Sequence, residues 1–196
     1  MKQAVKTLAL FTIFLSLSVS SFSQLKLPFG NGVANDVKKV INDYPNQFSN
    51  LRGEMITENG QSIDYECNFK VDGAEKTMIT KYTANGKNVS SWSALMLTTE
   101  DFAAAKKKFK ALFQQLNNIT VKMTNTNAFY LKGKYEEPVE EKKFFSSMFA
   151  FSNATEEMKK LKVEIVMEYE LLEWKVKVLV YEKEREDDER GDPLGN

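Results

Sequence analysis

The sequence LKVEIVMEYELLEWKVKVLVYE, residues 161–182, contains two stretches in which apolar and polar residues alternate. The apolar positions are Leu161, Val163, Ile165, Met167, Tyr169 and Leu171 in the first stretch, and Trp174, Val176, Val178 and Val180 in the second. Successive side chains of a β-strand point to opposite faces, so each stretch predicts a strand with one buried face. Because the two strands are long and closely joined, we expect them to pair antiparallel.

Upstream, a similar alternation fills residues 63–71, with apolar residues at Ile63, Tyr65, Cys67, Phe69 and Val71. The dipeptide Asp72-Gly73 predicts a turn, and a strand over residues 77–82 would complete a hairpin. Shorter patterns predict strands over residues 91–97 and 128–132. The single cysteine, Cys67, lies on the apolar face of its strand, where we expect it to be a buried core residue.

Two further segments have the helical period of 3.6 residues, residues 33–48 and 100–116. Their apolar positions are Ala34, Val37, Ile41, Tyr44 and Phe48 in the first, and Phe102, Ala105, Phe109, Leu112 and Leu116 in the second. This spacing places one apolar stripe on each helix. We expect Pro45 to end the first helix and Thr99 to cap the second.

The order of a helix followed by strands occurs twice. The segment Phe48-Ser49-Asn50-Leu51 matches Leu116-Asn117-Asn118-Ile119 at a constant offset of 68 residues. We therefore predict an α+β fold, a largely antiparallel sheet with two packed helices, and interpret the repetition as a tandem α-β4 duplication. Residues 24–183 would form a single domain with halves at about 30–97 and 98–183, and residues 133–160 would be an insertion in the second half.

The N-terminal segment is typical of a cleavable secretory signal peptide over residues 1–23. Lys2 and Lys6 precede an apolar run, and small residues including Ser21 and Ser23 follow it. The alternative is an uncleaved membrane anchor, but the apolar run is short for a bilayer span. We expect a mature chain that begins at Gln24, is periplasmic or secreted, and has no membrane span. Its charged end, residues 184–196, is typical of a disordered tail.

Composition excludes several function classes. The chain has no histidine and one cysteine, so histidine-based catalysis, the usual zinc sites and thiolate metal clusters are not available. Removal of residues 1–23 takes away two of the 27 basic residues and none of the 27 acidic ones, which leaves a net charge of −2. This charge does not favour nucleic-acid binding. We find no motif for a cofactor or a metal ion.

The most distinctive local feature is an apolar cluster within residues 133–160. Phe144, Phe145, Met148 and Phe149 have the spacing i, i+1, i+4 and i+5, which we interpret as one side of a helical turn. The cluster follows an acidic stretch that contains proline. Such a cluster either completes the core or forms a docking surface for a protein or an apolar ligand.

Two functions remain open from the sequence. The first is an exported, non-catalytic binding or accessory protein, with Phe144, Phe145, Met148 and Phe149 as candidate binding residues and an unknown protein or apolar ligand as partner. The alternative is a histidine-free hydrolase or lyase that works outside the cytoplasm through carboxylates. A group of lysines, Lys106, Lys107, Lys108 and Lys110, is either an anion-binding face or the solvated side of the second helix.

Overall fold

The computed structural model describes residues 32–83, 89–122, 128–152 and 155–182. The predicted signal peptide and charged tail lie outside these residues. The helices are α2 (Gly32–Asp43), α3 (Phe102–Leu116) and α4 (Glu156–Lys160), and 3-10 turns span Tyr44–Asn46 and Ser49–Leu51. The strands are β1 (Arg52–Asn59), β2 (Ser62–Cys67), β3 (Lys76–Tyr82), β4 (Val89–Thr99), β5 (Thr120–Val121), β6 (Phe129–Gly133), β7 (Phe144–Ser152), β8 (Leu161–Glu170) and β9 (Glu173–Glu182).

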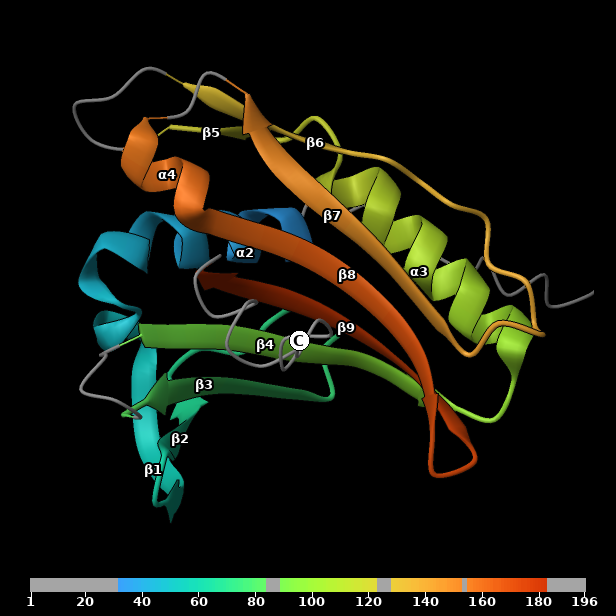
Figure 1. Cartoon of the computed structure of the whole chain (residues 1–196), viewed down its shortest axis with the longest axis horizontal. Coiled ribbons are helices and arrows are strands. Elements are labelled where there is room, and N and C mark those ends of the chain that lie inside the picture. The colour runs from blue at the N-terminus through green and yellow to red at the C-terminus, as the bar shows by residue number, and fades with distance from the viewer. Residues whose placement is uncertain (1–31, 84–88, 123–127, 153–154, 183–196) are drawn as a thin grey trace, which may run out of the picture. The chain divides into compact units, whose positions relative to one another are not determined.

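The described residues form one nine-stranded sheet in the order β1-β2-β3-β4-β9-β8-β7-β6-β5 (Figure 1). Every neighbouring pair of strands is antiparallel. Strands β1 to β4 follow α2 as one meander, strands β5 to β9 follow α3 as another, and the β4–β9 pair joins the two. The predicted antiparallel α+β fold is confirmed at this level.

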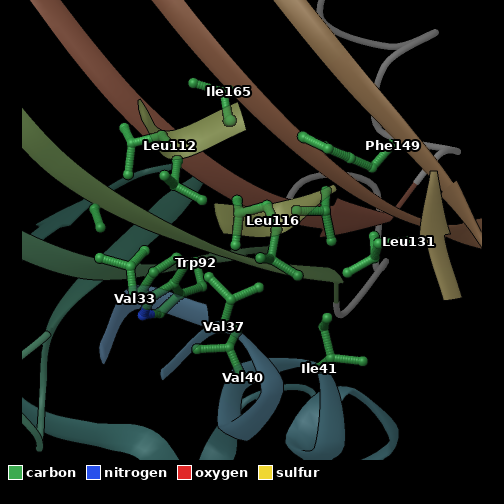
Figure 2. Close-up of a cluster of buried hydrophobic side chains, with 14 of the residues drawn as sticks. Val33, Val37, Val40, Ile41, Trp92, Leu112, Leu116, Leu131, Phe149 and Ile165 are labelled. Atoms are coloured by element: carbon green, nitrogen blue, oxygen red, sulfur yellow. The ribbon is translucent and has the colours of Figure 1, made fainter. Parts of the chain in front are cut away.

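The helices cover one face of the sheet. Helix α3 packs against β4, β8 and β9, and α2 packs against α3. Side chains from both helices belong to the same buried cluster as Trp92 of β4 and Ile165 of β8 (Figure 2). Each predicted apolar position of the two helices is buried except Phe102, which is half-buried. Burial of these stripes, rather than any cross-link, is the main source of stability.

The antiparallel pairing of β8 and β9 is confirmed, with a register that runs from Leu161 opposite Glu182 to Glu170 opposite Glu173. The inward side chains are buried as the alternation predicts, from Leu161 to Met167 and from Trp174 to Val180. Leu171 is the exception. The prediction placed it on the apolar face of a strand, whereas it lies with Leu172 in the turn, where both side chains are exposed.

The predicted cap of the second helix needs correction, whereas the predicted end of the first helix is confirmed. Helix α3 is capped by Asp101, whose carboxylate accepts a hydrogen bond from the Ala103 amide at 2.8 Å. Thr99 instead accepts a bond from the Asp101 amide at 3.1 Å, so it positions the cap residue rather than capping the helix. The first helix does end near Pro45. The chain then reverses through Gln47 and the buried Phe48, both at a φ of 55°.

Strand β2 is shorter than its apolar alternation predicts, because it ends at Cys67. The segment beyond it reaches a turn in which the Ala74 amide donates to the Val71 carbonyl at 3.2 Å. Gly73 adopts a φ of +68° in this turn, a conformation that glycine accepts at little cost. Cys67 is a free thiol that is half-buried against the core rather than fully enclosed.

The segment over residues 133–160 is not an addition to the strand pattern. It contains β7, which lies between β6 and β8 and pairs with both. The aromatic cluster is therefore extended rather than helical. Helix α4 lies between β7 and β8. Residues 134–143 connect β6 to β7, and we call them the strap.

Candidate functional site

Strand β7 divides the four candidate binding residues between the two faces of the sheet. Phe145 and Phe149 point towards the helices and are fully buried. The ring of Phe149 stacks on Phe113 of α3 with centroids 5.4 Å apart. A Cβ at Gly133 would lie 2.8 Å from the Phe149 ring, so the neighbouring strand approaches this ring closely. These two phenylalanines belong to the core.

Phe144 and Met148 lie on the opposite face, because side chains alternate along a strand. Cross-strand pairing sets Phe144 beside Glu168 and Met148 beside Glu164 on β8. We call this side of β7, β8 and β9, opposite to α2 and α3, the outer face. It carries Phe144, Ser146, Met148, Glu164, Val166, Glu168, Lys175, Lys177, Leu179 and Tyr181. Met148 is half-buried, whereas Phe144 keeps 47% of its surface exposed.

A buried carboxylate holds the middle of the outer face together. Glu164 is only 5% exposed and accepts a hydrogen bond from the Tyr181 hydroxyl at 2.7 Å. It accepts a second hydrogen bond from the Ser146 hydroxyl on β7. Buried polar groups are costly unless they are paired, and here two hydroxyls pair with one carboxylate across three strands. This cluster fixes the strands relative to one another and leaves the carboxylate enclosed.

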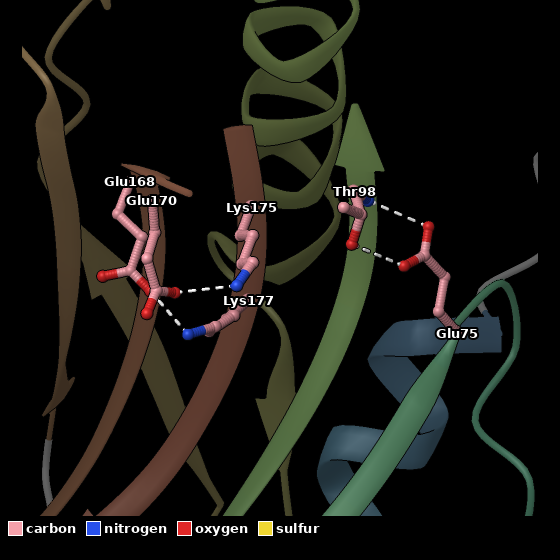
Figure 3. A network of polar contacts seen from close by, with 6 residues as sticks. All are labelled: Glu75, Thr98, Glu168, Glu170, Lys175 and Lys177. Atoms are coloured by element: carbon pink, nitrogen blue, oxygen red, sulfur yellow. Dashed lines mark hydrogen bonds and ion pairs between the residues drawn. The ribbon is translucent and has the colours of Figure 1, made fainter. Parts of the chain in front are cut away.

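Two ion pairs lie on the part of the outer face that is nearest to the β8–β9 turn (Figure 3). Lys177 contacts Glu168 at 2.5 Å and Lys175 contacts Glu170 at 2.8 Å. The hydrogen bond from Lys175 is the main reason that the pKa of Glu170 lies below its ordinary value, and the same bond raises the pKa of Lys175. Both shifts favour the charged forms. Glu170 and Lys175 therefore stay ionised near neutral pH and are poor candidates for proton exchange.

The strap is fastened along α3. Tyr135 packs against Phe109 and Phe113, with ring centroids 6.0 Å and 5.2 Å away. Its hydroxyl is buried without a hydrogen bond of good geometry among the described residues, close to the Glu137 carboxylate. Burial first, and then Glu137, raises the pKa of Tyr135 to about 12. Lys106 forms an ion pair with Glu137 at 2.8 Å.

Two of the four lysines of α3, Lys106 and Lys108, lie close to carboxylates of the same chain. Besides the Lys106 pair, Lys108 is near Asp72 and Glu75. Burial lowers the pKa of Lys108, and the two carboxylates oppose that change. The arrangement favours a role in holding the strap and the β2–β3 connection to the helix over a role as an anion-binding face. Among the described residues, no group of three or more potential ligands could hold a metal ion.

Three of the exposed large apolar residues lie where β7 starts and β8 turns into β9. Leu171 and Leu172 are 81% and 77% exposed, more than any other large apolar residue in the described part of the chain. The Tyr169 amide donates to the Lys143 carbonyl at 2.8 Å, which brings the start of β7 to the turn. Phe144 follows directly. We call Phe144, Leu171 and Leu172 the hairpin end.

Sequence reasoning identified only one member of the hairpin end. Phe144 belongs to the predicted cluster, whereas Leu171 continues the apolar alternation and the sequence pattern makes no prediction for Leu172. The sequence signal for the exposed leucines was the composition of the segment that joins the two predicted strands. Two paired strands with no glycine, asparagine or proline between them must turn on residues that turns disfavour.

Comparisons with protein-family models, with curated proteins and with solved structures found no match for this chain. In the described part of the chain, none of the helices has the length and apolar character needed to cross a bilayer.

Proposed function

We propose that this chain is an exported, non-catalytic binding protein that engages a protein or apolar ligand through the outer face and its hairpin end. The observation that carries the proposal is the exposure of Phe144. Its neighbour Phe145 is buried in the core, whereas Phe144 is 47% exposed at the end of the sheet where β8 turns into β9 through two exposed leucines. Exposed apolar groups that gather at one end of a surface are candidates for an interaction site.

The alternative of a carboxylate-dependent hydrolase or lyase has less support. A general acid or base needs a pKa near the working pH and access to substrate. Glu164 is enclosed and already accepts two hydroxyl hydrogen bonds. The pKa of Glu170 is shifted away from neutrality by Lys175. Both carboxylates favour a structural interpretation.

The binding site can be tested with a fluorescent apolar probe, anilinonaphthalene sulfonate. We expect the folded protein to bind the dye and Phe144→Ser to weaken that binding without lowering the melting temperature. Tyr130 on β6 is a matched control, because it is a 41% exposed aromatic residue on another strand. Equal dye binding by wild type, Phe144→Ser and Tyr130→Ser would contradict the proposed surface.

Export is proposed from the sequence of residues 1–23 and is tested separately. N-terminal mass spectrometry of the exported protein should give Gln24 as the first residue. An intact Met1 in the exported fraction would contradict this part of the proposal.

The repeated order of elements supports a duplication as the origin of the domain. Each half begins with a helix on the same face of the sheet and continues as an antiparallel meander. Strand β1 begins at Arg52 and β5 at Thr120, which reproduces the offset of 68 residues seen in the sequence. The final strands of the two halves, β4 and β9, are neighbours, as expected if the halves are related by an approximate twofold axis.

A further inference from the structure

The turn between β8 and β9 has an unusual composition for its conformation. Glu170 and Glu173 face each other as the last cross-strand pair, so Leu171 and Leu172 alone form a two-residue turn. Both have positive φ angles, 52° and 68°. Turns of this kind favour Asn-Gly, because residues with larger side chains are strained at positive φ.

Exposure adds a second cost to this strain. The two leucines are the most exposed large apolar side chains in the described part of the chain, so neither gains burial from its position. A more stable and more soluble turn would need only two substitutions. Backbone strain at an exposed position that gains no burial is not explained by folding stability. It points instead to a role in binding another molecule.

The base of the hairpin is rigid. Trp174 is buried, and its ring packs against Tyr169 at 5.1 Å and against Phe102 of α3 at 5.2 Å. The Lys143 ammonium lies over both the Tyr169 and the Trp174 rings. The two leucines are thus presented in one fixed geometry. A fixed apolar anchor loses little conformational entropy when it binds.

We infer that the β8–β9 turn is a preformed anchor that inserts Leu171 and Leu172 into an apolar pocket of a protein partner with a basic rim. This inference rests on the proposed binding function and specifies the class of partner. The charges next to the anchor select a protein over a lipid surface. Residues 170–175 contain two carboxylates, Glu170 and Glu173, and one lysine, Lys175, which pairs with Glu170. Insertion into a bilayer would therefore carry a net negative charge to an anionic headgroup layer.

The test uses a variant that removes the anchor and improves the turn. In the mature protein, Leu171→Asn combined with Leu172→Gly deletes both apolar side chains and supplies the preferred turn sequence. We expect the melting temperature to rise by about 2–4 °C. The matched control is Met55→Thr combined with Ile56→Thr, which removes two exposed apolar residues from the edge strand β1. A fall in the melting temperature of the turn variant would show that the leucines serve the fold and would overturn the inference.

Partner contact is measured by photo-crosslinking in the cells that export the protein. Leu172→benzoylphenylalanine should give one dominant protein adduct whose crosslinked residues line an apolar pocket bordered by lysine or arginine. The same photoreactive residue at Ile56 should not give this adduct, and added salt should weaken the interaction. Absence of an adduct at position 172, or equal adducts at both positions, would overturn the inference.

Vesicles distinguish the lipid alternative. Wild-type protein should not sediment with vesicles of mixed phosphatidylcholine and phosphatidylglycerol. Sedimentation that is lost in the turn variant would assign the leucines to a membrane and reject the protein pocket. One combination of results would separate the two proposals. If Phe144→Ser abolishes dye binding, and if the turn variant with Phe144→benzoylphenylalanine still crosslinks to the same partner, the proposed binding function stands. The inference about Leu171 and Leu172 would then be overturned.

Discussion

The two faces of the β7–β8–β9 region are stabilised by different interactions. On the face towards the helices, Phe145, Phe149 and Trp174 are buried in a continuous apolar core. On the outer face, Glu164 is held by hydroxyl groups and Lys175 pairs with Glu170. Apolar burial is worth kilocalories per side chain, whereas exposed ion pairs contribute little. Substitutions on the two faces should therefore separate folding from binding.

The largest expected effect comes from the core side of β7. Phe149→Ala removes a fully buried ring that stacks on Phe113, so we expect a loss of about 3–5 kcal/mol in the free energy of unfolding. Phe144→Ala, five residues earlier on the outer face, should change it by less than about 0.5 kcal/mol. Urea denaturation of both variants measures the difference. Comparable losses in the free energy of unfolding would contradict the assignment of Phe149 to the core and Phe144 to the surface.

This contrast also shows why the aromatic cluster was misassigned from the sequence. The spacing i, i+1, i+4 and i+5 fits one side of a helix, and it equally fits two residues on each face of a strand. The intervening Ser146 and Ser147 do not distinguish the two periods. Only pairing with β8, a contact far along the chain, selects the extended conformation. Tertiary pairing of this kind is not encoded in a local pattern.

Long regular patterns were more reliable. The stripe from Ala105 to Leu116 and the alternation in residues 161–180 each extend over several periods, so a single exception does not change the prediction. Boundaries were less predictable, because Thr99 and Asp101 are both good caps two residues apart. Leu171 was misplaced because it continues the alternation by one step after the strand has ended.

We expect changes in stability of intermediate size from two buried polar residues, one with hydrogen-bond partners on the outer face and one without any among the described residues on the core side. Glu164→Ala deletes the acceptor of two hydrogen bonds and should cost about 1–3 kcal/mol. Ser147 lies on the core side of β7, and its hydroxyl finds no hydrogen-bond partner in the described part of the chain. Ser147→Ala should therefore stabilise the protein by up to about 1 kcal/mol.

Thermal and urea denaturation of these two variants, measured in parallel, check both signs. A stabilising Glu164→Ala would show that the carboxylate is kept for a purpose other than joining the strands. A clear loss from Ser147→Ala would indicate that its hydroxyl has a partner in solution.

The smallest effect concerns the ion pair between Lys175 and Glu170. The pKa of Glu170 is depressed in the folded state, so its contribution to stability is present above the ordinary value of 4.5 and is lost as the pH falls through the folded-state pKa. The pKa of Lys175 is raised, so its contribution is present below 10.5 and is lost as the pH rises through the folded-state pKa. The pair therefore supports the outer face between mildly acidic and mildly alkaline pH.

A carboxylate titration by NMR can isolate this pair from the rest of the face. Lys175→Gln removes the hydrogen bond that is the largest cause of the Glu170 shift, so the pKa of Glu170 should return towards its ordinary value. Lys177→Gln is the matched control, because Lys177 acts on Glu170 only through a minor coulombic effect and pairs with Glu168 instead. Added salt should reduce the shift in the wild type, since Glu170 is exposed and Lys175 is only half-buried. Equal responses to the two substitutions would mean that Glu170 responds to the general positive charge of β9 rather than to Lys175. In that case the cross-strand pairing would not order this part of the outer face, and the rigidity of the hairpin would depend on the Trp174 packing alone.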